Sequence, residues 1–322
     1  EGSTYWGYGT SYSVWTASML ESAFGTDFGL ADARGFMESA VFRKLMTAPS
    51  GMYFNYGDCG DGRKENGDIV LAWFAAKTGN ETFYEEARFL RPAKAMGELS
   101  RHAGAGLVWL SQYETQGTMT LPLAWKAGGI NPIFIFRGGE GDEGGYYFGG
   151  KGGRASISHG NMDAGAFLFE LDGVRWAVEL GNQSYHEVEK TGFNLWGREQ
   201  DAQRWQLLTK NNYGHNTLTV NGALHRVDGK AEIVSFKGGE NAEAVVDMTP
   251  IFGDAVAKAT RRFVKDGADA VLIEDVIEQS EKTESVVWQM LTQSEVEVVS
   301  GGAVLRDKGK ALDVRVLSHP DV

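Results

Sequence analysis

The chain has 322 residues, of which 42% are hydrophobic and 23% charged, as expected for a globular protein with a sizeable core. The formal net charge of −12 and the lack of a basic block argue against nucleic acid as the main partner. A single cysteine excludes an internal disulfide framework, and no apolar run approaches the roughly 18 residues of a membrane-spanning helix. The chain starts without Met and without a signal peptide, which we interpret as a piece of a longer protein.

The first hundred residues are predicted to form helices. Apolar side chains recur at helical spacing over 15–24, 36–45 and 69–77, and Gly79 closes the third stripe. A fourth stripe over 83–90 stops before Pro92. Because such stripes usually pack in a core, we expect a helical part over residues 1–106.

From about residue 107 the pattern changes to alternating apolar residues separated by turn dipeptides. Asp-Gly at 172–173, Asn-Gly at 221–222 and Asp-Gly at 266–267 each predict a β-hairpin between the strand-like runs on either side. The other predicted strands are 133–137, 285–291, 296–299 and 311–317. The order predicts an α+β fold, with helices followed by a large antiparallel β-sandwich over 107–322.

The segment 137–155 is the richest in glycine. It contains no phosphate-loop pattern, because no Gly-Lys-Ser or Gly-Lys-Thr occurs in it. Two interpretations stay open: a plain connecting loop, or a mobile flap over a cleft that carries Lys151 and Arg154.

Two histidines stand in polar segments that each precede a strand. His159 lies in SISHGNMDAG and His215 lies in NNYGHNT. A strand can hold such side chains rigidly at the edge of a cleft. Each histidine on its own is equally compatible with a structural role.

The chain resembles the heparinase II/III-like polysaccharide lyases, and the heparinase II branch most of all. The stretches that carry the resemblance are SISHGNMDAGAFLFELDGVRWAVELGNQSYHEVEKTGFNLW, QDAQRW, NNYGHNTLTVNGALH and the opening EGSTYWGYGT. The resemblance covers nearly the whole chain. It implies an (α/α) toroid followed by an antiparallel β-sandwich, with residues 1–106 as only the last part of the toroid.

The resemblance also implies catalytic residues. It assigns the catalytic Tyr of the family to Tyr5, with Tyr8 as the alternative, and the catalytic His to His159. Nearby cations, aromatic rings and amides are candidate substrate contacts: Tyr8, Arg154, Arg198, Trp196 and Asn212. Arg204 is a further local cation that could contact a sugar carboxylate.

The family's zinc ligands fall on Asn161, Glu179 and His215, and two of these depart from the family's His and Asp. An amide oxygen is a poor zinc ligand, so zinc, a harder ion such as calcium or manganese, and no metal all stay open. A straight hairpin would place Asn161 about 17 Å beyond the residue opposite Glu179, so the segment after His159 must curl back if a site exists.

The implied reaction is β-elimination in a uronic-acid polysaccharide, with Tyr5 as base and Tyr5 or His159 as acid. The family's carboxylate-neutralising residue lies upstream of the Tyr motif and hence outside this chain. The alternatives are a catalytically impaired carbohydrate-binding protein and a hydrolase that pairs Asp163 with Glu179. We expect an acidic polysaccharide as partner, a periplasmic or secreted location and, from family precedent, a homodimer.

Overall fold

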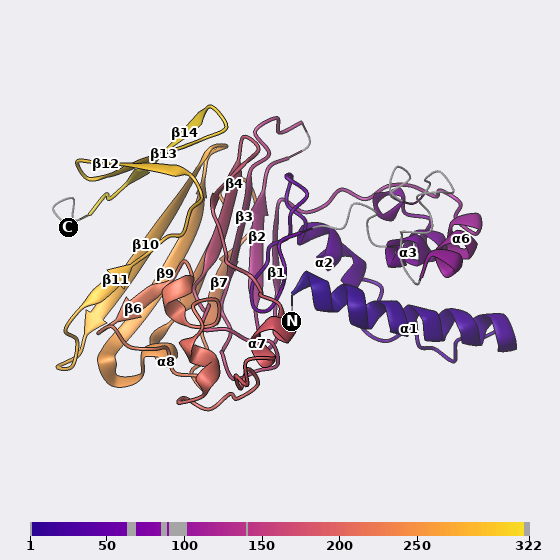
Figure 1. Ribbon diagram of the computed structural model, residues 1–322. Helices are drawn as coiled ribbons and strands as arrows, with labels where there is room; N and C mark the ends of the chain where they lie inside the picture. Colours follow the sequence, from indigo (N-terminus) through magenta and orange to yellow (C-terminus); the bar gives the residue numbers. More distant parts are fainter. Residues whose placement is uncertain (1, 63–68, 85–88, 90–101, 140, 319–322) are drawn as a thin grey trace.

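The computed structural model of the protein describes residues 2–62, 69–84, 89, 102–139 and 141–318. Helices gather on one side of the molecule and layered strands on the other, with the chain running from the first to the second (Figure 1). This order confirms the predicted α+β fold. In the described ranges, no helix is both long and apolar enough to cross a membrane.

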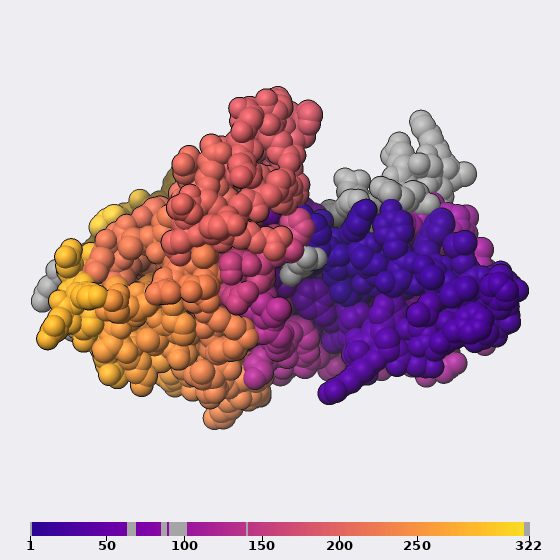
Figure 2. All heavy atoms as spheres, turned by 90° about the horizontal axis from the view of Figure 1, so that it is seen from below, coloured from indigo at the N-terminus to yellow at the C-terminus, as the bar shows by residue number. Residues whose placement is uncertain are grey.

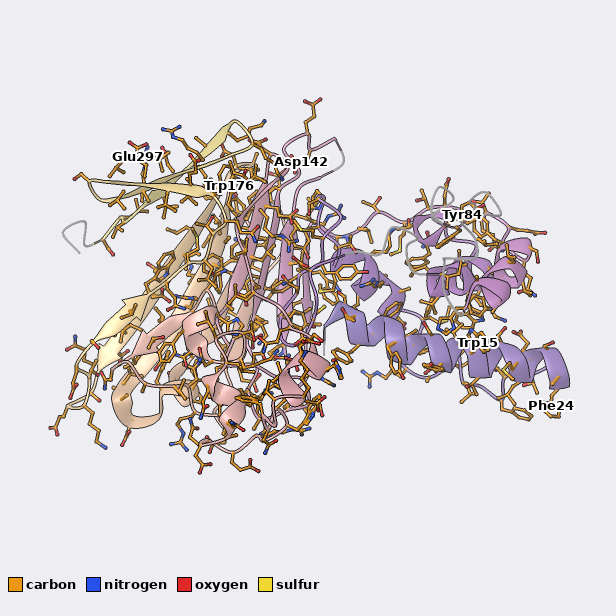
Figure 3. The ribbon with its side chains drawn as sticks, in the orientation of Figure 1. Trp15, Phe24, Tyr84, Asp142, Trp176 and Glu297 are labelled. Atoms are coloured by element: carbon orange, nitrogen blue, oxygen red, sulfur yellow. The ribbon has the colours of Figure 1, made fainter. Side chains whose placement is uncertain are left out.

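The helical part contains long and short helices joined by turns. The predicted stripes correspond to α1 (Ser3–Phe24), α2 (Ser39–Leu45) and α3 (Val70–Thr78), which are followed by η1 (Glu81–Phe83) and α6 (Ala103–Ser111). Gly79 ends α3 in the left-handed conformation, as predicted. The predicted helix over 83–90 lies mostly outside the described residues. Trp15 and Phe24 mark two points along α1 in Figure 3.

The change from helix to strand falls later than the expected residue 106. Helix α6 continues to Ser111, and the first strand begins at Ala124. The apolar run after Gly106 stays helical because Trp109 is buried among the helices, where its ring nitrogen donates to Ser18 Oγ at 2.9 Å. The division into two domains remains a prediction.

A five-stranded antiparallel sheet follows in chain order. Its strands are β1 (Ala124–Ala127), β2 (Ile133–Arg137), β3 (Tyr147–Lys151), β4 (Phe167–Leu171) and β5 (Val174–Ala177). The β4–β5 hairpin is confirmed, with Val174 opposite Leu171 and positive φ angles at Asp172 and Gly173 in the turn. A register shift follows at Phe169 and Glu170, and β5 ends at Ala177, after which the Val178 N–H donates to the Leu291 carbonyl.

The glycine-rich segment is neither a plain loop nor a flap in its second half. It forms β3, a strand paired on both sides and buried along its length, and Lys151 is only 1% exposed. Its glycines make room for aromatic rings, because a Cβ at Gly149 would lie 2.8 Å from Phe54 and one at Gly150 would lie 2.3 Å from Phe134. The glycines therefore mark close packing rather than flexibility.

A four-stranded sheet covers one face of the first sheet. It contains β7 (Glu232–Lys237), β8 (Glu243–Asp247), β9 (Val256–Asp266) and β10 (Ala270–Gln279), and the predicted hairpin at 266–267 joins the last two. Alternate residues of β2 face opposite sides, since Phe134 packs against Phe263 of β9 whereas Ile135 packs with Phe54. The main core thus lies between the two sheets, where Trp176 is seen in Figure 3.

The predicted hairpin at 221–222 is wrong. Strand β6 (Leu218–Val220) pairs with β11 (Val286–Trp288), and 223–225 forms no strand because the amide of His225 donates to Asn212 Oδ1. The backbone N–H of Asn221 donates to the Ser285 carbonyl instead. The remaining elements are a small sheet and short helices: β12 (Glu295–Val299), β13 (Gly302–Asp307), β14 (Lys310–Arg315), α7 (Tyr185–Glu189), α8 (Thr249–Phe252), η2 (Gln203–Gln206), η3 (Asn212–Gly214) and η4 (Gly253–Ala255).

Candidate active site

Three aromatic side chains from distant segments meet where α1 begins. The rings of Tyr5 and His159 stack with centroids 4.0 Å apart. The hydroxyl of Tyr185, on α7, lies 2.6 Å from that of Tyr5 and 3.1 Å from His159 Nδ1. The structure therefore brings together the two residues predicted to be catalytic and adds a third.

The backbone of His159 is held in an uncommon conformation. Its φ of 56° lies in the left-handed region, which a residue other than glycine seldom adopts. The Asp58 amide donates to the His159 carbonyl at 3.1 Å, and a Cβ at Gly57 would lie 2.8 Å from that same oxygen. Residues 57–58 thus fix the turn that presents the His159 ring.

Asp58 is the buried anion beneath this group. Its carboxylate accepts from Tyr185 at 2.9 Å, from Arg204 at 3.0 Å and from Lys210. Burial raises the pKa of Asp58, but the charges of Lys210 and Arg204 outweigh burial and hold that pKa below its usual value. Asp58 therefore remains an acceptor for the Tyr185 hydroxyl at neutral pH.

This arrangement assigns the protons. Because Tyr185 donates its hydroxyl proton to Asp58, its oxygen accepts from Tyr5 and from the Nδ1–H of His159. Burial, the hydrogen bond from Tyr5 and the charge of Asp58 raise the pKa of Tyr185 far above its ordinary value. Tyr5 thus carries a proton, and with Nδ1 of His159 as a donor, Nε2 is the ring nitrogen that can accept one.

Two further predicted residues lie at the rim of this group. Trp196 is 47% exposed, and the edge of its indole approaches Tyr185 at 5.0 Å between ring centroids. Exposed Arg198 donates to Ser158 Oγ at 3.1 Å, next to His159 in the chain. In Figure 2 the segment around residues 185–205 forms a salmon lobe beside the junction of the helical part and the sandwich.

A cavity of about 350 Å³ adjoins Tyr5 on the side of α2 and β1. Its described lining is mostly aromatic or small: Tyr5, Trp6, Phe42, Tyr56, Ala127, Gly128, Asn131 and Ile133. Such a lining suits the apolar face of a sugar ring.

Other predicted contacts lie elsewhere. Tyr8 is 63% exposed on α1 and contacts Tyr12, not His159. Asn212 is fully buried, and its amide bonds to Thr219 Oγ1 and to the His225 amide, so it supports the interior. Arg154 is exposed just after the end of β3, and its charge acts on Asp228 rather than on a described member of the Tyr5 group.

The predicted metal positions lie in one buried region but do not fit a shared zinc ion. Glu179 Oε2 and His215 Nδ1 bond to each other at 2.6 Å, and Asn161 Oδ1 accepts from Arg204 at 3.0 Å. Two buried nitrogens have no partner among the described residues: Asn161 Nδ2, which is a donor and not a ligand, and His215 Nε2, which could supply one ligand at most. Within those residues, no group of three or more His, Cys, Asp or Glu side chains is arranged to hold a metal.

The Asp163–Glu179 hydrolase pair is not supported either, because Asp163 is buried and bound to Lys151.

Asp58, Tyr185 and Lys210 were missed by the sequence analysis. Tyr185 stands inside a motif that carries the family resemblance, NQSYHEVE, so its position was a usable signal. Asp58 had no such signal, because its partners lie 127 and 152 positions further along the chain.

Buried His225 makes stability depend on pH. Burial lowers its pKa to about 4, although the hydrogen bond that Nε2 donates to the Leu218 carbonyl acts in the opposite direction. The unfolded state, with a pKa near 6.5, binds the proton first, so this contribution is complete above that pH and is lost as the pH falls toward 4. We expect the melting temperature of the unaltered protein to fall over this pH window. The melting temperature of the His225→Gln variant should fall less. Equal losses in thermal melts from pH 7 to 4 would refute this.

A family model described as "Heparinase II/III-like, C-terminal" matches residues 148–322. Since this is more than half of the chain, the protein belongs to that family. Among curated protein sequences, none matches the chain.

Solved structures of similar fold include heparan sulfate lyase HepC from Pedobacter heparinus, at 14% identity and a TM-score of 0.58, with 93% of this chain and 42% of that one covered. A structure of heparinase III has 14% identity and a TM-score of 0.54, covering 95% and 46%. A second heparinase III has 15% identity and a TM-score of 0.56, covering 93% and 42%. At these identities the likeness shows the fold, and the chain spans less than half the length of those proteins.

Proposed function

We propose that this chain is part of a polysaccharide lyase that cleaves a uronic-acid-containing glycan by β-elimination. The observation that carries the proposal is the stacked Tyr5–His159 pair, with its protons set by Tyr185 and Asp58. In this pair, Tyr5 holds a proton that it can donate, and His159 has a ring nitrogen that can accept one.

The proposed reaction differs from the expectation that Tyr5 is the base: because Tyr5 carries a proton, Nε2 of His159 removes the proton at C5 of the uronate. The electrons of that C–H bond form the C4=C5 double bond, and the bond from C4 to the bridging O4 breaks. The Tyr5 hydroxyl then donates its proton to the departing O4. For the uronate epimer that offers its proton to the other face, Tyr5 first passes its hydroxyl proton through the Tyr185 hydroxyl to Asp58. Its oxygen then takes the C5 proton and donates that proton to the departing O4.

The substrate class follows from family membership and from the names of the similar structures. HepC is named a heparan sulfate lyase, which supports a heparin-like or heparan-sulfate-like substrate or another glycuronan. Arg198 and Trp196 at the rim are proposed to contact a sugar carboxylate and a sugar ring. Assignment to the heparinase II branch, a periplasmic or secreted location and a homodimer remain predictions.

Product analysis tests the proposed reaction. Elimination yields an unsaturated uronate at the new non-reducing end, lighter by one water than the hydrolysis product. We expect mass spectrometry of digested glycuronan oligosaccharides to show the unsaturated species. Products that incorporate heavy oxygen from labelled water would instead identify a hydrolase.

A catalytically impaired carbohydrate-binding protein is the second candidate. The departure at Asn161, whose side chain binds Arg204, favours it. Binding of an oligosaccharide without any unsaturated product in the complete protein would support this candidate over the lyase.

A further inference from the structure

Arg204 binds Asn161, which stands at one of the family's zinc-ligand positions. The Arg204 side chain is buried, and its Nη2 atom lies within 2.8–3.0 Å of four oxygen atoms. These are both carboxylate oxygens of Asp58, the Gly160 carbonyl and Asn161 Oδ1. Nη1 donates in addition to the Leu195 carbonyl at 3.1 Å. A cationic nitrogen is thus enclosed by oxygens from separate segments, as a hard metal ion would be.

Asn161 explains why a guanidinium suits this place. An amide oxygen is a weak zinc ligand but a good acceptor for Arg. One of the two residues that depart from the family's ligand pattern is therefore the one whose oxygen binds Arg204.

We propose that the guanidinium of Arg204 takes the place of the family's metal ion, and that it ties the His159-bearing segment to Asp58. The inference concerns how the site is held and is independent of the proposed lyase activity. Arg204 is thus a positioning residue, since it bonds to the two residues that follow His159 and to the carboxylate beneath Tyr185.

The buried charges around Arg204 support this role. Arg204, Lys210 and Lys151 are buried together with the carboxylates of Asp58, Asp163 and Glu179. Lys210 binds Asp58, and Lys151 binds Asp163 at 2.5 Å. The formal charges of these side chains cancel, so a divalent ion would add buried charge that no described carboxylate is left to offset.

The test begins with the unaltered protein and needs no substrate. We expect elemental analysis to find well under one bound metal per chain. The melting temperature should stay within about 1 °C on adding a chelator, zinc, calcium or manganese. One tightly bound metal per chain, with a chelator-induced fall of several degrees, would overturn the proposal.

Variants then test Arg204 itself. Arg204→Met should lower the melting temperature by about 10 °C, because Asp58 loses a buried partner, and added metal should not restore it. Arg226→Met is the matched control, since Arg226 is exposed and pairs only with Asp228 among its described ion-pair partners. Equal melting temperatures for the two variants would contradict the inference.

Arg204→Lys keeps the positive charge but loses the planar guanidinium that reaches several oxygens at once. This variant replaces Arg204→Met in the test if Arg204→Met fails to fold. Hydrogen–deuterium exchange should then rise most at the amides of 158–163, which the guanidinium holds in place. Exchange that rises evenly over the sandwich would show a general loss of stability and refute a positioning role.

Discussion

Tyr5→Phe is expected to lower kcat for glycuronan cleavage by about 10²–10⁴-fold while leaving the fold intact. The substitution removes the hydroxyl that carries the proton for the departing O4, yet keeps the ring stacked on His159 at 4.0 Å. KM should change little, because the ring still shapes the cavity beside it. His159→Ala is expected to lower kcat by a similar factor, since it removes the proton acceptor. Steady-state kinetics on the complete protein measures both.

Tyr185→Phe provides the matched comparison. It deletes a hydroxyl that contacts Tyr5, His159 and Asp58 but transfers no proton to substrate in this account. We expect a smaller loss of kcat and an altered pH profile, because the protons of Tyr5 and His159 lose their shared acceptor. If Tyr5→Phe were as active as the unaltered protein, Tyr5 would not be the acid.

Lys151→Met is expected to destabilise the fold by about 3–5 kcal/mol, because it leaves the Asp163 carboxylate buried without its cation. Both side chains are about 1% exposed, and Asp163 also accepts from the Gly57 amide, next to Asp58. Burial raises the pKa of Asp163, but the charge of Lys151 and the hydrogen bonds from Lys151 and Gly57 outweigh burial and hold that pKa below its usual value. Denaturant unfolding measures the change.

Lys190→Met is the control for this variant. Lys190 is half-exposed and pairs with Glu187 on α7, so its loss should change the free energy of unfolding by less than about 1 kcal/mol. A Lys151→Met protein as stable as this control would show that the buried pair contributes no net stability.

Local signals predicted the elements that depend on local chemistry. Gly79 ends α3, and Asp172 and Gly173 close the β4–β5 hairpin, with a positive φ angle at each of these residues. The β9–β10 hairpin is also real, but Asp266 is its last paired residue and the turn begins at Gly267, whose φ is positive. The Asn-Gly pair at 221–222 has the same conformation as the pair at 172–173 but joins no hairpin, since β6 finds its partner 66 or more positions away in β11. Distant strand pairing overrode the turn signal there.

The candidate site likewise contains residues that the sequence predicted and residues that only the structure shows. The resemblance supplied Tyr5 and His159, and the structure brings their rings into contact. Lys151 was expected in a connecting loop or a flap, yet Gly149 and Gly150 leave room for aromatic rings, and the segment packs as a buried strand in which Lys151 binds Asp163. Asp58 owes its position to packing between segments far apart in the chain, which no pattern along the sequence expresses.

The most direct test of the central claim is ultraviolet absorbance during incubation of the complete protein with a panel of glycuronans. An unsaturated uronate absorbs in the ultraviolet, whereas the products of hydrolysis and a merely bound polymer do not. The account predicts a steady rise with at least one polymer, unchanged by chelator and abolished by His159→Ala. A flat trace with every polymer, despite measurable binding, would contradict it and leave a carbohydrate-binding protein of lyase fold.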